Sequence, residues 1–168
     1  MVSNSNLKNK RYALISTFDK SNLKSICKTL KKFNIKIIST GLTSMHIKKL
    51  GFPCLNISDL TKFKEILNGR VKTLHPKIHA SLLFNRNDKE HIKTFNNLKF
   101  PRIDFVISNL YSFENFVTDK DHNKIIEMID IGGPTLLRSS AKNFNSVTII
   151  SSPNLYSSFI KEMKANKG

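Results

Sequence analysis

The stretch YALISTFDKSNLKSICKTLKKFNIKIISTGLTSMHIKKLG, residues 12–51, decides the fold, because it repeats one strand–turn–helix unit. Two of its segments, residues 12–16 and 35–39, are short apolar runs typical of buried strands. Apolar residues at helical spacing follow each run, over residues 23–30 and 45–50. Strands that are connected through helices lie parallel and are joined by right-handed crossovers. The stretch therefore predicts an α/β domain built on a mainly parallel sheet.

The same alternation continues to the end of the chain. It predicts strands at Cys54–Ser58, Ile103–Ile107 and Val147–Ile150, and helices at Asp59–Leu67 and from Leu155 through Met163. No internal repeat or low-complexity linker divides the 168 residues, so we expect a polar tail over residues 1–10 and a single domain over residues 11–168. The tail lacks the apolar centre of a signal peptide, and no apolar run approaches the roughly 18 residues of a membrane span. We therefore predict a cytoplasmic protein without a membrane partner. Cys27 and Cys54 fall in predicted secondary structure and are expected to be free core residues.

The formal net charge of +16 is the most unusual feature of the composition. Such a charge can indicate a nucleic-acid binder, whose phosphate contacts need many cations. However, only five of the 28 basic residues are arginines, and the lysines are scattered through every predicted helix. No arginine-rich arm or zinc-finger spacing accompanies them. The sequence therefore argues against nucleic-acid binding, which stays a third alternative.

The segment Ile129–Asn143, IDIGGPTLLRSSAKN, combines an acid, two glycines and a helical pattern. We expect Pro134 at the first helical position and free amides at Gly132 and Gly133, which would suit an anion. The helical pattern has an apolar stripe and a polar stripe. The apolar stripe comprises Leu136, Leu137, Ala141 and Phe144, and the polar stripe comprises Thr135, Arg138, Ser139 and Lys142. The polar stripe either faces solvent, as most charged helix faces do, or lines a cleft.

Polar residues follow the predicted strands at their carboxyl ends, where ligands bind in parallel α/β folds. The turns Thr17–Lys20 and Thr40–Thr43 could hold a phosphate on Lys20 and two helix N-termini, although ordinary helix capping explains either turn alone. Residues 68–76, NGRVKTLHP, add two cations and a hydroxyl, and Asn109 and Tyr111 follow the strand at Ile103–Ile107. Tyr111 could equally be a core tyrosine.

His75 and His79 have the spacing of a metal pair on a helix. No third ligand accompanies them, and Pro76 interrupts the segment. We therefore predict no metal site.

Several motifs occur together in one order along the chain. They are Ser16…Asp19-Lys20, Ser39-Thr-Gly-x-Thr43, Gly69-Arg-Val-Lys-Thr-Leu-His-Pro76, Asn109-Leu-Tyr111, Ile129-Asp-Ile-Gly-Gly-Pro-Thr-Leu-Leu-Arg138 and Ala141-Lys-Asn143. Together they closely resemble the IMP cyclohydrolase domain of the bifunctional purine-biosynthesis enzyme, where this domain precedes a larger AICAR transformylase. The resemblance implies a methylglyoxal-synthase-like three-layer α/β sandwich. It also implies a hydrolase of the cyclic-amidine class, run in the dehydrating direction, which closes formyl-AICAR to IMP without a cofactor or metal.

The resemblance implies roles for particular residues. The catalytic set would be Lys142, Asp130, Lys72 and Tyr111, with Asp130 orienting the nucleophile, Lys142 moving protons and Lys72 stabilising charge. The substrate would be bound by Asp19, Lys20, Thr40, Gly41, Thr43, Arg70, Val71, Lys72, Thr73, Ser108, Asn109, Asp130, Ile131 and Gly132. Three residues depart from the family pattern: Phe18 replaces a serine, Leu42 a glycine and Ser112 a proline. The first two lie in the expected phosphate turns.

The resemblance leaves the assembly and one other function open. A homodimer and a linked or separate transformylase are both compatible with it. We expect these 168 residues to contain no transformylase domain and to have no transformylase activity. The main alternative function is a non-catalytic regulatory domain of the same fold that binds a phosphate or nucleotide.

Overall fold

A computed structural model describes residues 10–168, so most of the predicted tail lies outside the described residues. The strands are β1 (Arg11–Thr17), β2 (Lys36–Ser39), β3 (Cys54–Asn56), β4 (Arg102–Asn109) and β5 (Thr148–Ile150). The helices are α1 (Leu23–Lys32), α2 (Gly41–Lys49), α3 (Ile57–Thr61), α4 (Pro76–Leu83), α5 (Lys89–Leu98), α6 (His122–Glu127), α7 (Gly132–Lys142) and α8 (Tyr156–Ala165), with short 3-10 turns η2 (Leu67–Gly69), η3 (Phe113–Asn115) and η4 (Pro153–Leu155).

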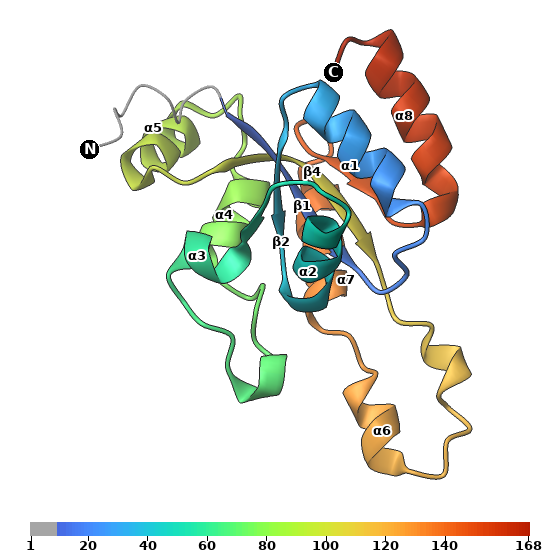
Figure 1. Ribbon diagram of the computed structural model, residues 1–168. Helices are drawn as coiled ribbons and strands as arrows, with labels where there is room; N and C mark the ends of the chain where they lie inside the picture. Colours follow the sequence, from blue (N-terminus) through green and yellow to red (C-terminus); the bar gives the residue numbers. More distant parts are fainter. Residues whose placement is uncertain (1–9) are drawn as a thin grey trace.

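The five strands form one parallel sheet in the order β3-β2-β1-β4-β5, with helices on both faces (Figure 1). One apolar cluster joins the sheet to α1, α2 and α8, and a second joins the opposite face to α3, α4 and α7. The predicted three-layer α/β sandwich is therefore confirmed. Within the described part of the chain, no helix has the length and apolarity that a membrane crossing needs.

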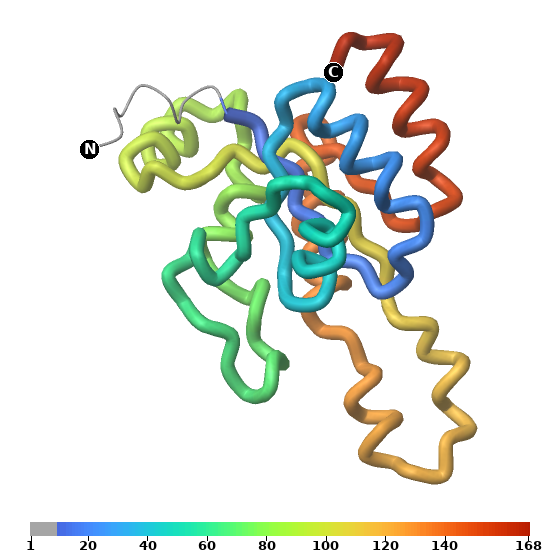
Figure 2. Tube along the Cα trace, in the orientation of Figure 1, coloured from blue at the N-terminus to red at the C-terminus, as the bar shows by residue number. Residues whose placement is uncertain are grey.

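The strand order places a topological switch point between β1 and β4. From β1 the chain moves through β2 to β3, and the other half of the sheet continues from β4 to β5. Ligands of such folds bind at the carboxyl ends of the strands beside this point. Residues 62–72 and 110–131 both project beyond this edge, as the trace in Figure 2 shows. The carboxyl edge is therefore the place to look for a site.

Some predicted elements differ in their boundaries. The helix predicted at Asp59–Leu67 is shorter and earlier, because α3 ends at Thr61 and Lys62 adopts a left-handed conformation. Pro76 does not interrupt its segment but opens α4, where a proline needs no amide partner. Cys27 is fully buried, which raises the pKa of its thiol to about 12, whereas Cys54 is only half-buried.

The buried stripe of α7 also differs from the prediction. Ala141, in the last turn of the helix, is exposed. Phe144 is 72% exposed, because the helix ends at Lys142 and Phe144 lies beyond it. Leu136 is buried as predicted, and Gly133 and Ser140, which lie beside the predicted stripe, complete the buried face. Ser140 can be buried because its hydroxyl donates to the Leu136 carbonyl at 2.8 Å.

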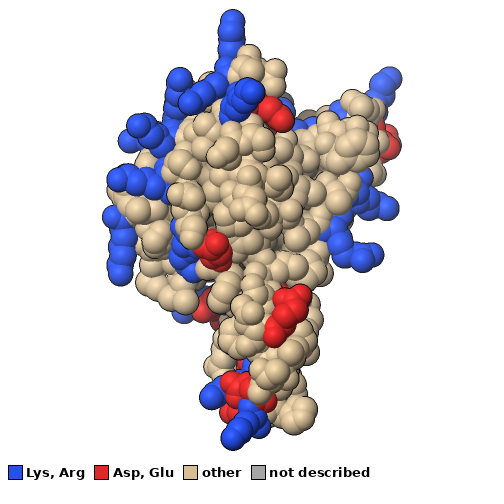
Figure 3. Space-filling view, turned by 90° about the vertical axis from the view of Figure 1, so that its right-hand side faces the viewer, with Lys and Arg blue, Asp and Glu red and all other residues tan. Residues whose placement is uncertain are grey.

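Positive charge is dispersed on the face that Figure 3 shows. Lysine and arginine side chains stand around the rim of the main body, and the centre of this face carries few of them. The projecting lobe below it carries charges of both signs. This distribution agrees with the scattered lysines of the sequence.

Candidate active site at the carboxyl edge of the sheet

The Asn109 side chain holds the turn between β1 and α1. Its Oδ1 accepts hydrogen bonds from the amides of Phe18 and Asp19, at 2.7 and 2.9 Å, and its Nδ2 donates to the Asp19 carbonyl at 2.9 Å. Asn109 ends β4 directly beside Thr17 at the end of β1. The amide therefore clamps the two strands at the switch point, and its main contacts are with backbone. A substrate contact by Asn109 stays a prediction.

If the carboxyl edge binds a phosphorylated substrate, Asn109→Ala is expected to raise the KM for it about tenfold and to lower kcat much less. The reason is that three hydrogen bonds to the Lys20 turn are lost, each worth roughly 1 kcal/mol. Asn109→Asp keeps the acceptor for both amides and should recover most of the affinity. Steady-state kinetics of both variants check this, and a fall in kcat with an unchanged KM would contradict a positioning role.

The turn itself places Asp19 and Lys20 at the surface. Asp19 Oδ1 accepts from the Ser21 amide at 2.7 Å. Hydrogen bonding from the Ser21 side chain, and then from this amide, lowers the pKa of the Asp19 carboxyl. Lys20 Nζ donates to the Phe18 carbonyl at 3.0 Å, so the ammonium is held over the turn. Thr43 is buried and its hydroxyl donates to the Thr17 carbonyl at 3.0 Å, which ties α2 to the end of β1.

The N-terminus of α2 lies against the Lys72 ammonium. A Cβ on Gly41 would stand 3.6 Å from Lys72 Nζ, and Gly41 itself has a φ of +38°. The first intrahelical hydrogen bond runs from the Ser44 amide to the Thr40 carbonyl, and the Thr40 side chain does not cap the helix. The amides before Ser44 therefore remain at the positive end of the helix dipole. A cation beside a positive helix end favours an anionic ligand.

Gly69 makes room for this lysine. Its φ is +89°, and a Cβ there would lie 2.5 Å from Lys72 Cε and 2.8 Å from Nζ. The ammonium is also 3.5 Å from the Glu65 carboxylate. Lys72 is thus oriented by a glycine on one side and by an acid on the other.

The N-terminus of α7 lies against the next residue, Thr73. A Cβ on Gly132 would be 2.7 Å from Thr73 Oγ1. Asp130 Oδ1 accepts from the Gly133 amide at 2.8 Å, and a Cβ on Gly133 would meet Asp130 Oδ2 at 2.6 Å. The Gly133 amide is therefore capped and not free, contrary to the prediction. Pro134 occupies the third helical position and not the first, because α7 begins at Gly132.

Lys72 and Thr73 consequently lie between two helix N-termini, those of α2 and α7. Tyr111 lies at the same edge, 39% exposed, with its ring 4.9 Å from the ring of Phe18. It is not a core tyrosine. Ser108 is buried at the end of β4, and its hydroxyl has no partner among residues 10–168. A polar edge with two helix N-termini beside it can bind a phosphorylated small molecule.

Arg70 connects the two projecting segments. Its guanidinium forms an ion pair with Glu127 at the end of α6. Hydrogen bonding between them raises the pKa of Arg70 and lowers that of Glu127. Both side chains are exposed, so the pair contributes little to stability. The Arg70–Glu127 ion pair does join residues 62–72 to residues 110–131 beyond the carboxyl edge.

Lys142 is the predicted catalytic residue that the structure does not bring to this edge. It ends α7, ten residues after Gly132, which corresponds to about 15 Å along the helix axis. The neighbouring Asn143 bonds the carbonyls of Leu82 and Phe84 at the far end of α4. The catalytic role of Lys142 stays a prediction from the resemblance.

The polar stripe of α7 divides between solvent and α4. Ser139 Oγ lies 2.9 Å from His79 Nδ1 on α4, and Arg138 is exposed. His75 caps α4 by accepting from the Lys77 amide, so the two histidines make separate structural contacts. Within the described residues, no group of three or more His, Cys, Asp or Glu side chains could hold a metal.

The remaining predicted binding residues lie at the carboxyl edge or on the segments that project from it. Val71 pairs with Ile66 in an isolated bridge, and Ile131, 54% exposed, immediately precedes α7. Sequence reasoning missed Glu65 and Glu127, which hold Lys72 and Arg70. No local pattern marks either acid, because each contact depends on how a long loop returns to the edge.

The sequence of this chain is similar to a protein family model and to several known proteins. A family model described as an MGS-like domain matches residues 22–135. The bifunctional purine biosynthesis protein PurH of Caldicellulosiruptor saccharolyticus is 46% identical over 156 residues, which is 92% of this chain and 30% of that protein. PurH of Elusimicrobium minutum is 42% identical over 159 residues, 93% of this chain and 31% of that protein. The chain thus spans about a third of the length of these relatives.

Among solved structures, the crystal structure of ForH superposes with a TM-score of 0.81. The two sequences are 26% identical, and the match covers 94% of this chain and 79% of that one. This similarity supports the three-layer architecture described above.

Proposed function

The chain belongs to the MGS-like domain family, and from this premise we propose that it closes formyl-AICAR to IMP with loss of water. The observation that carries the proposal is the position of Lys72 and Thr73 between the N-termini of α2 and α7. The names of the relatives, bifunctional purine biosynthesis protein, support the same pathway.

The reaction needs positioning more than it needs a reagent. The carboxamide nitrogen attacks the formyl carbon of the same molecule, and its proton passes to the formyl oxygen to give a carbinolamine. The carbinolamine C–O bond then breaks, and water leaves with the proton of the formamido nitrogen. Holding the two groups in contact can contribute several kcal/mol to the rate. A donor beside the formyl oxygen lowers the barrier further, because negative charge grows there.

The residues of the carboxyl edge supply these elements. Lys72 would donate to the formyl oxygen, and Asp130 would accept from the carboxamide through Oδ2, since its Oδ1 is occupied by the Gly133 amide. Tyr111 would orient the heterocyclic base of the substrate. Lys20 and the free amides of α2 would hold the phosphate group of the substrate. The exposed Leu42 and the Phe18 ring replace two expected phosphate contacts, so these backbone amides carry more of the binding.

A spectroscopic assay tests the proposal directly. Formyl-AICAR is incubated with the chain, and purine absorbance is followed against the spontaneous reaction at the same pH. An accelerated rise that depends on protein concentration is expected. Saturable IMP binding without any acceleration would reject ring closure and favour a non-catalytic nucleotide-binding domain.

A further inference from the structure

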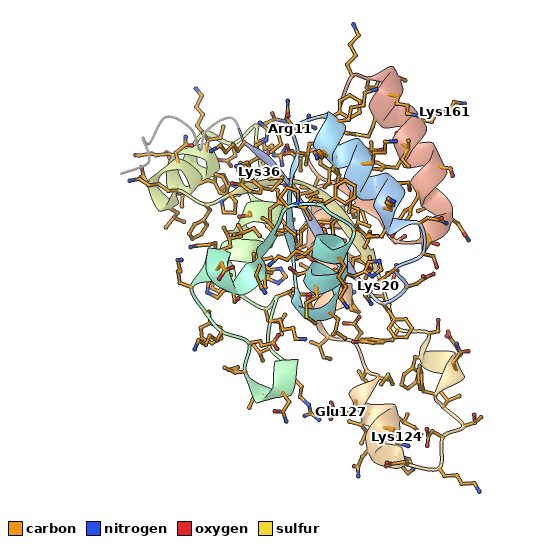
Figure 4. The ribbon with its side chains drawn as sticks, viewed as in Figure 1. Arg11, Lys20, Lys36, Lys124, Glu127 and Lys161 are labelled. Atoms are coloured by element: carbon orange, nitrogen blue, oxygen red, sulfur yellow. The ribbon has the colours of Figure 1, made fainter. Side chains whose placement is uncertain are left out.

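The amino edge of the sheet, opposite to the candidate active site, contains three of the five arginines of the chain. Arg11 begins β1 and Arg102 begins β4, and the two residues are direct neighbours in the strand register. Arg86 joins them from the segment between α4 and α5. Figure 4 shows Arg11 and Lys36 at the end of the molecule opposite to Lys20 and Glu127. Like charges on adjacent strands repel, so this edge requires negative charge.

A β-bulge supplies the first negative charge. Tyr12 pairs with Ile103 and Ala13 pairs with Phe105, so Asp104 is the extra residue on β4. Asp104 is only 4% exposed. The bulge aims its carboxylate at the three arginines.

The carboxylate contacts all three guanidinium groups. Oδ2 accepts from Arg11 Nε at 2.8 Å, and Oδ1 accepts from Arg102 Nε at 2.8 Å and lies 2.7 Å from Arg86 Nη1. Arg86 also donates from Nη2 to the Ile103 carbonyl at 2.9 Å. A purely structural ion pair would need one arginine, and here three share one acid.

Donors therefore remain after Asp104 is satisfied. Arg11 and Arg102 bond it through Nε, and among residues 10–168 their terminal nitrogens make no recorded hydrogen bond. Arg86 Nε is buried and has no partner in the described part of the chain, and burial lowers the pKa of Arg86. Terminal guanidinium nitrogens held in a fixed orientation match the oxygens of a phosphate or carboxylate.

A cavity of about 250 Å³ adjoins these donors. Its lining also includes three apolar residues, two hydroxyl residues, one acidic side chain, one amide and the last residue of the sequence: Phe105, Phe159, Met163, Ser146, Thr148, Glu162, Asn166 and Gly168. The Arg11 guanidinium lies 5.0 Å from the centre of the Phe105 ring, which limits its movement. The volume is smaller than the roughly 300–1,000 Å³ of pockets for drug-sized ligands, so the cavity suits one small anion.

We propose that the amino edge is a second binding site, for a small oxyanion of phosphate or carboxylate type, held by Arg11 and Arg102. Asp104 organises the donors, and Arg86 anchors Asp104 to the bulge. The site lies at the opposite end of the strands from Lys72 and does not rest on the ring-closing activity.

Nuclear magnetic resonance of the arginine Nε–Hε groups tests the site in the intact chain. Inorganic phosphate and succinate are titrated separately, with chloride keeping the ionic strength constant. The signals of Arg11 and Arg102 are expected to shift and saturate with at least one anion, while exposed Arg138 on α7 stays unchanged. The responding anion identifies the ligand as phosphate or carboxylate. Unchanged Arg11 and Arg102 signals with both anions, or an equal shift of Arg138, would overturn the proposal.

Two matched variants extend the test. Arg102→Gln removes one guanidinium, and Arg138→Gln removes the same charge from the exposed face of α7. Affinity measured at the Arg11 signal should fall about tenfold in Arg102→Gln and remain unchanged in Arg138→Gln. Equal affinities in the two variants would contradict the proposal, and the wild-type titration decides the question even if Arg102→Gln does not fold.

Discussion

Lys72→Ala is expected to lower kcat for ring closure by about 10³-fold while the chain remains folded. Removing one donor to a developing oxyanion costs roughly 10²–10³-fold, and the charged Lys72 ammonium should lie at the upper end of this range. The Lys72 side chain is 35% exposed and its ion pair with Glu65 is to an exposed acid, so stability should change little. Turnover of formyl-AICAR under saturating substrate measures the effect.

Lys124→Ala is the matched control for Lys72→Ala. It removes the same charge from α6, on the lobe that projects from the same edge (Figure 4). Its kcat should stay within about twofold of the parent, since a screened surface charge contributes little. If both variants lose turnover equally, the net charge at this edge matters and Lys72 has no specific role.

Asp130→Asn is expected to lower kcat about 10²-fold with a nearly unchanged midpoint of thermal unfolding. The asparagine oxygen can still accept from the Gly133 amide, so the cap of α7 survives while the carboxylate charge is lost. Asp130→Ala removes the cap as well and should cost about 1 kcal/mol of stability. Kinetics and thermal unfolding of the two variants distinguish the effect of the Asp130 charge on kcat from the effect of the helix cap on stability.

The control for this substitution is Asp121→Asn. Asp121 caps α6 by accepting from the Asn123 amide at 3.0 Å, which is the same kind of contact away from Lys72. Its turnover should be unchanged. An Asp130→Asn enzyme as active as this control would remove the carboxylate from the mechanism.

The site residues differ in how far the sequence could predict them. Lys72, Asp130 and Tyr111 were predicted to meet, and each lies on the carboxyl edge or on a segment beside it. The polar stripe of α7 and the resemblance place Lys142 with them, whereas the eleven-residue α7 separates Lys142 from the Gly132 end by the length of the helix. A helix fixes the axial distance between two of its residues, so a shared motif does not imply a shared site.

Asn109 shows a second limit of prediction from the sequence, which concerns the partners of a side chain. The sequence places it correctly at the end of a strand. Its side-chain amide forms hydrogen bonds with the backbone of residues 18 and 19, in the turn that follows the neighbouring strand. That pairing spans about 90 positions and depends on the register of β1 with β4. The local pattern contains no information about which backbone groups such a side chain meets.

The sequence by itself determined the alternation of strands and helices, the parallel sheet and the edge at which polar residues gather. Hydrophobic periodicity and turn chemistry are local properties, and they are sufficient for these features. Only the tertiary structure decided that two helix N-termini meet at Lys72 and Thr73, that the Gly133 amide is capped, and that a bulge turns Asp104 toward three arginines. Those contacts join distant segments, and their geometry is set by strand register and loop packing rather than by neighbours in the chain.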